Sequence, residues 1–119
     1  MLRYRLSAAA QADVIESLAW TQAQFGAAAR LRYESLIVAA LRDAATQPDR
    51  PGSIERPELG AGVRSWHLRL SRARADVRVV RRPRHFLIYR SEPGLLVVGR
   101  LLHDAMESAR HIDPEKPWE

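Results

Sequence analysis

The sequence predicts an α+β domain in which a helical hairpin packs on one face of a small, mostly antiparallel sheet. Three observations favour this fold class. A short alternating segment opens the chain, two helical patterns follow it, and after Gly62 the hydrophobic pattern changes to period two. The chain has 119 residues, which suits one domain and is short for two. We therefore expect residues 1–119 to form a single domain with the order β-α-α-loop-β-β-β-α.

The first strand and the first helix follow from local patterns. Residues 2–6 alternate apolar and charged side chains, which predicts a short strand. Ser7 stands where a helix N-cap belongs, so a helix is expected from Ala8 to Gln24. Gly26 favours its end, because glycine adopts the left-handed conformation that terminates helices. The expected inward face holds Val14, Ile15, Leu18, Gln22 and Phe25.

A second helix is predicted from Ala27 to Thr46. Its apolar residues recur at helical spacing and form one stripe. The connection to the first helix is so short that the two should pack as an antiparallel hairpin. The stripe consists of Tyr33, Leu36, Ile37, Ala40, Leu41 and Ala44.

The second half of the chain predicts strands and turns. Gln47 to Gly62 is rich in proline and glycine and should be a loop. Residues 65–70 alternate and predict a strand, residues 71–76 predict a turn, and Val77 and Val79 begin an extended stretch that Pro83 interrupts.

Two further strands and a short helix are expected at the end. His85 to Arg90 should be a strand, a tight turn follows at residues 92–94, and Leu95 to Leu102 is apolar on both faces like a central strand. Asp104, with Glu107 three residues later, resembles a capping box, which predicts a helix from Ala105 to Ile112. Residues 113–119 are expected to be a disordered tail.

Composition excludes several classes of protein. The chain has no cysteine, which rules out disulfides and thiolate sites and fits a reducing cytoplasm. Residues 1–7 lack the apolar core of a signal peptide, and no apolar run approaches the roughly 20 residues of a membrane span. We expect a soluble cytoplasmic protein without membrane contact.

The excess of positive over negative charge is confined to the second half. Residues 1–62 hold seven arginines and seven acids, whereas residues 63–90 hold nine arginines and one acid, Asp76. A surface of this kind attracts nucleic acid or an acidic protein. The alternative is a solvated, arginine-rich face of the sheet.

Motifs for catalysis and cofactors are scarce. The four histidines have no metal-ligand spacing, and the chain has no nucleophile elbow, P-loop or dinucleotide fingerprint. We expect neither a metal nor a cofactor. Asp13 and Glu16 on the first helix should face solvent or form ion pairs. The aromatic residues Trp66, Phe86 and Tyr89 could stack on bases, but alternating aromatics in strands more often belong to the core.

Arg100 and His103 are the best candidates for acid–base chemistry. Arginine can stabilise a phosphorane while histidine moves a proton, so the pair could cleave RNA without a metal. The structural alternative makes Arg100 a salt-bridged strand residue and His103 a helix-entry residue.

Several segments, in order and spacing, resemble the ParE branch of the ParE/RelE toxin–antitoxin family. The resemblance covers about residues 2–112 and is strongest at the end of the chain. The matching segments are Tyr4-Arg5-Leu6-Ser7, Trp20 with Gln24-Phe25-Gly26, Arg32 to Ile37, Arg56 to Ser65, Arg82 to Arg90 and Gly99 to Ile112.

The resemblance implies a fold, a function and partners. ParE-like proteins are toxins that most often poison DNA gyrase, and a ParD-like antitoxin neutralises them. RelE relatives instead cut messenger RNA, which would here require Arg64, Arg100 and His103. The only lysine, Lys116, lies in the tail, which counts against that nuclease alternative. A degenerate, non-toxic member that only regulates its operon is a third alternative.

Two sets of contact residues are predicted. The antitoxin should bring an acidic segment, form a hetero-oligomer with the toxin, and mediate any contact with operator DNA. Its contacts are predicted at Tyr33, Ile37, Leu41 and Trp66. Contacts with the target are predicted at Arg64, Arg82, Arg84, Arg100, His103 and Met106.

Overall fold

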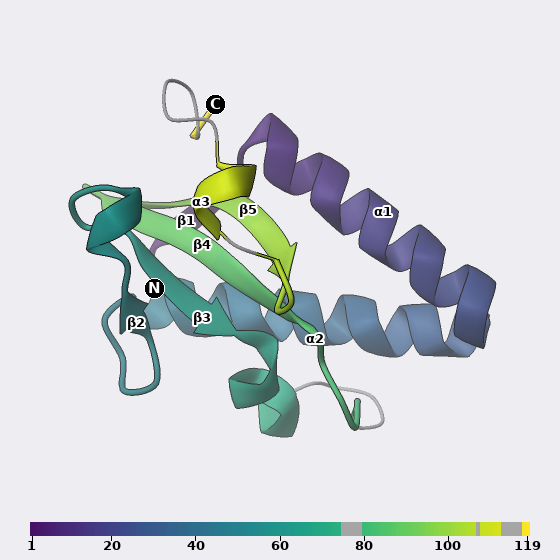
Figure 1. Ribbon diagram of the computed structural model, residues 1–119. Coiled ribbons are helices and arrows are strands. Elements are labelled where there is room, and N and C mark those ends of the chain that lie inside the picture. The colour runs from purple at the N-terminus through teal and green to yellow at the C-terminus, as the bar shows by residue number, and fades with distance from the viewer. Residues whose placement is uncertain (75–79, 107, 113–117) are drawn as a thin grey trace.

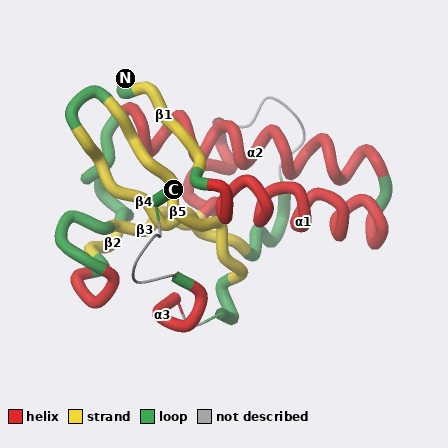
Figure 2. Tube along the Cα trace, turned by 90° about the horizontal axis from the view of Figure 1, so that it is seen from above, coloured by secondary structure: helices red, strands yellow, loops and turns green. Residues whose placement is uncertain are grey.

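The computed structural model describes residues 1–74, 80–106, 108–112 and 118–119. Helices α1 (Ala8–Phe25) and α2 (Ala27–Thr46) form a hairpin that covers one face of a sheet (Figure 1). The predicted α+β class and helical hairpin are therefore confirmed. Seen from above, both helices reach past the end of the sheet, and α3 lies on its other side (Figure 2). The strands are β1 (Arg3–Leu6), β2 (Ile54–Glu55), β3 (Arg64–His67), β4 (His85–Glu92) and β5 (Leu95–His103).

The sheet has the order β1-β5-β4-β3-β2 in the described part of the chain. β1 pairs in parallel with β5, and every other pairing is antiparallel. β1 covers only residues 95–98 of β5, since the chain turns at Ser7 into α1. The Ser7 hydroxyl caps this helix by accepting from the Ala10 N–H (3.0 Å), and it donates to the Gly99 carbonyl (2.7 Å). One buried serine thus joins the start of α1 to β5.

The inward face of α1 differs from the prediction. Leu18 is buried as expected, but Ile15 and Phe25 are each 68% exposed. The buried positions are Ala10, Leu18 and Thr21, with Val14 packed partly against the core. The helix is therefore rotated away from Ile15, and Phe25 is its last residue, next to the hairpin turn at Gly26.

Each face of the sheet has its own apolar cluster. The larger lies under the hairpin and includes Leu87 and Leu101, and the smaller, on the other face, includes Phe86 and Leu102. A register shift leaves Gly99 without a partner on β4, which is a bulge that resets the alternation along β5. Because apolar clusters cover both faces of the sheet, β5 carries apolar side chains on both of its faces. Trp66, Phe86 and Tyr89 are all buried, which confirms the prediction that they belong to the core.

The region predicted as loop, strand and turn folds differently. The loop contains β2 and a 3-10 helix, η1 (Pro57–Leu59), and β3 ends at His67, where a second 3-10 helix, η2 (Leu68–Arg74), begins. A buried network turns the chain there: Trp66 Nε1 donates to Ser71 Oγ (2.9 Å), and Ser71 donates to the Asp43 carboxylate (2.6 Å). Arg50 pairs with the same carboxylate at 3.3 Å. The predicted strand over residues 65–70 is therefore correct only as far as His67.

The C-terminal helix α3 (Ser108–His111) is shorter than predicted. Asp104 is not its cap, because Asp104 lies in a turn four residues earlier, where His103 Nδ1 accepts from the Ala105 N–H (3.1 Å). The extended stretch predicted from residue 77 and the tail residues 113–117 lie outside the described residues. Trp118, in contrast, packs on the smaller apolar cluster. Neither long helix of the described chain is apolar enough to cross a membrane.

Candidate functional site

A groove of about 1090 Å³ separates the helical hairpin from one end of the sheet. Helix α1 supplies Ser17, Trp20 and Phe25 to one wall, and α2 supplies Arg32 and Tyr33. The opposite wall comes from segment 80–84, the first residue of β4, and the end of β5 with the turn that follows. Its residues include Arg81, Arg82, Arg84, His85, Arg100, Leu101, His103 and Met106.

The groove brings together most of the residues predicted to contact a target. Five of the six line it, although they are up to 24 positions apart in the sequence. The exception is Arg64, whose guanidinium donates to Ser53 Oγ and pairs with Glu55 at 3.3 Å. Arg64 borders a separate, smaller depression near the N-terminus. The three residues required by the nuclease alternative are therefore not assembled at one site. The five in the groove are Arg82, Arg84, Arg100, His103 and Met106.

The four residues predicted to contact an antitoxin lie mainly in the core. Each has less than a tenth of its surface exposed, and all belong to the cluster between α2 and the sheet. Only Tyr33 also lines the groove. The others have little surface to offer a partner. They are Ile37, Leu41 and Trp66.

Arg100 is held by a carboxylate from α1. Its Nε and Nη2 donate to the two oxygens of Asp13 at 2.7 and 2.9 Å, a bidentate pair. Asp13 also accepts the backbone N–H of Leu101 (3.0 Å), so it occupies the edge of β5 that β1 leaves uncovered. The hydrogen bond to Asp13 raises the pKa of Arg100. Arg100 Nη1 donates to the His111 carbonyl, which ties α3 to the same pair.

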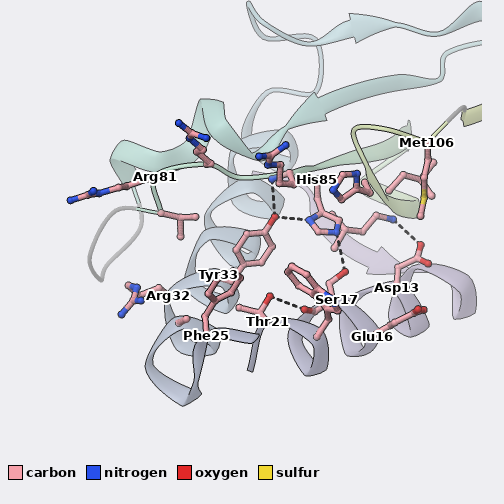
Figure 3. A pocket seen from close by; sticks show the side chains of 18 of the residues that line it. Asp13, Glu16, Ser17, Thr21, Phe25, Arg32, Tyr33, Arg81, His85 and Met106 are labelled. Carbon is pink, nitrogen blue, oxygen red and sulfur yellow. Dashed lines mark hydrogen bonds between the residues drawn. The ribbon is translucent and has the colours of Figure 1, made fainter. Parts of the chain in front are cut away.

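The floor of the groove holds a tyrosine–histidine pair. The Tyr33 hydroxyl accepts the Arg84 N–H (3.2 Å) and shares a second hydrogen bond, 2.6 Å long, with His85 Nδ1. The other ring nitrogen of His85, Nε2, lies 3.3 Å from Ser17 Oγ, within hydrogen-bond distance (Figure 3). His103 packs edge-on against His85, with ring centroids 5.4 Å apart.

Electrostatics make this pair a positioning element. Burial, followed by repulsion from His103, lowers the pKa of His85 to about 4. Burial raises the pKa of Tyr33 to about 12. Both groups are therefore neutral near pH 7, and both His85 nitrogens have partners within the chain. The arrangement fixes α1, α2 and segment 80–84 relative to one another.

Charge and hydrophobicity are distributed unevenly along the groove. Arg32 and Arg81 lie toward one end, whereas Asp13, Glu16 and Met106 lie toward the other (Figure 3). Asp13 is already paired with Arg100, but the described residues hold no ion-pair partner within 4.0 Å of Arg32 or Arg81. The groove therefore has a cationic end that no carboxylate of the described residues pairs with.

An apolar rim adjoins that end. Trp20 and Phe25 are 57% and 68% exposed, and their rings meet edge to face at 5.8 Å. Leu31, across the hairpin tip, is 62% exposed. Large apolar groups gathered at one exposed tip are typical of a surface that another chain covers.

Residues 4–108 match the family model described as the ParE toxin of the type II toxin–antitoxin system, parDE. The chain belongs to the ParE toxin family. No curated protein matches the chain closely enough to count as a relative. This ParE toxin is thus the toxin component of a type II system, which supplies it with an antitoxin partner.

Sequence reasoning missed three residues that shape the ParE toxin groove. Ser17 and His85 were not candidates, and Asp13 was expected to face solvent or form an ion pair. It forms the pair, with only 13% of its side chain exposed. The alternation of β4 could have indicated His85, because it places His85 on the same side of the strand as Leu87 and Tyr89, which face the hairpin.

Proposed function

We propose that this ParE toxin inhibits growth by binding DNA gyrase and blocking replication, and that a ParD-like antitoxin neutralises it by occupying the groove. The observation that carries the proposal is the groove itself, which has a cationic end, apolar walls and an exposed apolar rim. These are features of a surface that binds another macromolecule.

The nuclease alternative has less support from the geometry. Arg100 is engaged by Asp13, and Arg64 is engaged by Ser53 and Glu55 on another part of the sheet. A phosphorane needs an arginine whose guanidinium is free to meet it. His103 remains beside the groove, but the two arginines proposed to act with it serve contacts within the chain.

The shape of the groove indicates what an antitoxin segment should contain. Its apolar side chains would pack against Trp20 and Phe25, and its acidic side chains would meet Arg32 and Arg81. A segment that is disordered alone and folds on the toxin would gain from both contacts. Contact with operator DNA would then come through the antitoxin of the complex.

Induced expression in a susceptible host tests the target. Expression of the full chain, alone and with the adjacent small gene, is followed by separate measurements of DNA and protein synthesis. We expect DNA synthesis to stop first and the neighbouring gene to restore growth. If protein synthesis stops first, messenger RNA is the target. If neither stops, the chain is a non-toxic member of the family.

A matched pair of variants tests the antitoxin surface. Phe25→Ser removes an exposed ring from the groove rim, and Ile54→Ser removes an exposed apolar side chain, 58% exposed, from β2. We expect Phe25→Ser to weaken antitoxin binding about tenfold, as loss of an aromatic anchor does, and Ile54→Ser to change it little. Calorimetric titration measures both. Equal affinities in the two variants would place the antitoxin elsewhere.

A further inference from the structure

A row of arginines borders the groove and continues outside it. It begins on α2, crosses to segment 80–84 and reaches η2. Four of its members are exposed and two are half-buried. We propose that this row, called here the arginine band, binds the sugar–phosphate backbone of a nucleic acid. The arginine band consists of Arg32, Arg69, Arg72, Arg81, Arg82 and Arg84.

Hydrogen bonds make the arginine band continuous. Arg72 Nε donates to the Arg69 carbonyl (3.2 Å), and its Nη1 donates to the Arg81 carbonyl (3.0 Å). One guanidinium therefore links η2 to segment 80–84. The backbone N–H of Arg84 donates to the Tyr33 hydroxyl (3.2 Å), which links that segment to α2 beside Arg32. Three separate stretches of sequence thus form one surface.

The arginine band carries charge that the described residues do not neutralise. No described carboxylate lies within 4.0 Å of its guanidinium nitrogens. Asp104, whose backbone N–H binds the Arg84 carbonyl, has its carboxylate 3.4 Å from His67 and 3.5 Å from His103. Like charges at this density repel one another, and a polyanion relieves that repulsion. Guanidinium groups also match phosphate oxygens in two-point geometry.

The path of the arginine band over the surface favours a nucleic acid over an acidic peptide as its ligand. A peptide in the groove would meet Arg32 and Arg81, but it would leave Arg69 and Arg72 on η2 uncovered. A phosphate backbone carries charge at regular intervals and can follow the whole surface. Trp20 and Phe25 stand exposed at the groove rim, where bases of a single strand can stack. The inference goes beyond the gyrase proposal and does not depend on it.

Salt-dependent binding of oligonucleotides tests the inference. Fluorescence anisotropy is measured with the full chain and labelled random-sequence DNA and RNA, single- and double-stranded, between about 50 and about 200 mM salt. Arg81→Gln with Arg82→Gln removes two charges from the band. Arg3→Gln with Arg5→Gln removes two exposed charges from β1 and is the matched control. All four side chains are exposed, so neither variant should unfold.

The band variant should lower the slope of log K against log[salt] by roughly 1.4 to 1.8, about 0.7 to 0.9 for each lost phosphate contact. The control should keep the wild-type slope. Equal losses in both variants would reduce the effect to net charge and overturn the inference. Absence of oligonucleotide binding, with binding of polyglutamate instead, would make the band a protein-docking surface and also overturn it. If the protein inhibits gyrase but binds no oligonucleotide, this inference is wrong and the proposed function still holds.

Discussion

Removal of the Asp13 carboxylate tests whether Arg100 serves the fold. That carboxylate accepts three hydrogen bonds, two from Arg100 and one from the Leu101 N–H, all between 2.7 and 3.0 Å. Side-chain exposure is 13% for Asp13 and 22% for Arg100, so solvent screens the pair only in part. Asp13→Ala leaves two nitrogens of the Arg100 guanidinium and the strand N–H of Leu101 without their acceptor.

The expected loss follows from those three bonds. Charge-assisted bonds of this kind contribute about 1 kcal/mol or more each, and alanine regains roughly 0.5 kcal/mol of helix propensity. We therefore expect Asp13→Ala to lower the free energy of unfolding by roughly 2 to 3 kcal/mol. Arg100→Ala should cost about 2 kcal/mol, and the double variant should show a coupling energy of roughly 1 to 2 kcal/mol.

Urea unfolding of the four proteins in this cycle measures the coupling. Glu34→Ala, which removes an exposed carboxylate from α2, is the control and should change stability by less than about 0.5 kcal/mol. A coupling energy below about 0.3 kcal/mol would refute the reasoning. Arg100 would then be free to contact a substrate, and the nuclease alternative would regain its arginine.

Three further predictions concern the buried polar groups. Because the pKa of His85 falls from 6.5 in the unfolded chain to about 4 in the fold, the unfolded state binds more protons between those values. Stability is therefore complete above about pH 6.5 and should fall by roughly 3 kcal/mol as the pH drops to 4, a loss that urea unfolding should show to be smaller in His85→Asn. Tyr33→Phe removes the hydroxyl between His85 and the Arg84 N–H, and thermal unfolding should show a loss of about 1 to 2 kcal/mol. Asp43→Asn weakens the buried network that ends β3 and should cost about 2 kcal/mol in the same assay, whereas the exposed Asp49→Asn should cost little.

Each of these three predictions has an outcome that would contradict it. The same pH dependence in the wild type and in His85→Asn would assign the loss to other groups. Unchanged stability in Tyr33→Phe would mean that water replaces the hydroxyl. Equal losses of stability in Asp43→Asn and Asp49→Asn would show that the buried network of Asp43 does not stabilise the fold.

The helical hairpin was predictable because its signals are local. The Ser7 cap, the stop at Gly26, where φ is 93°, and the stripe of α2 all act within a few residues. β2 was not predictable, since two residues in a loop rich in proline and glycine show no periodicity. The end of β3 was missed for another reason: residues 65–70 alternate, but contacts from Asp43, far away in sequence, turn the chain into η2.

The candidate site was predictable in part. Family resemblance and charge indicated five residues that the groove brings together. Asp13 and Arg100 are 87 positions apart, so no pattern in the sequence could pair them. The antitoxin set shows a different limit, since an apolar stripe such as Tyr33, Ile37 and Leu41 has the same spacing whether it faces a core or a partner. Here it faces the core.

The most direct test of the central claim is a titration of purified DNA gyrase with the full chain, measuring supercoiling of plasmid DNA and the integrity of added messenger RNA together. If the protein acts by binding, supercoiling should fall as the chain reaches concentrations comparable to that of gyrase, and the RNA should stay intact. Unchanged supercoiling, with RNA cut by far smaller amounts of the chain, would contradict the account and identify the protein as an enzyme.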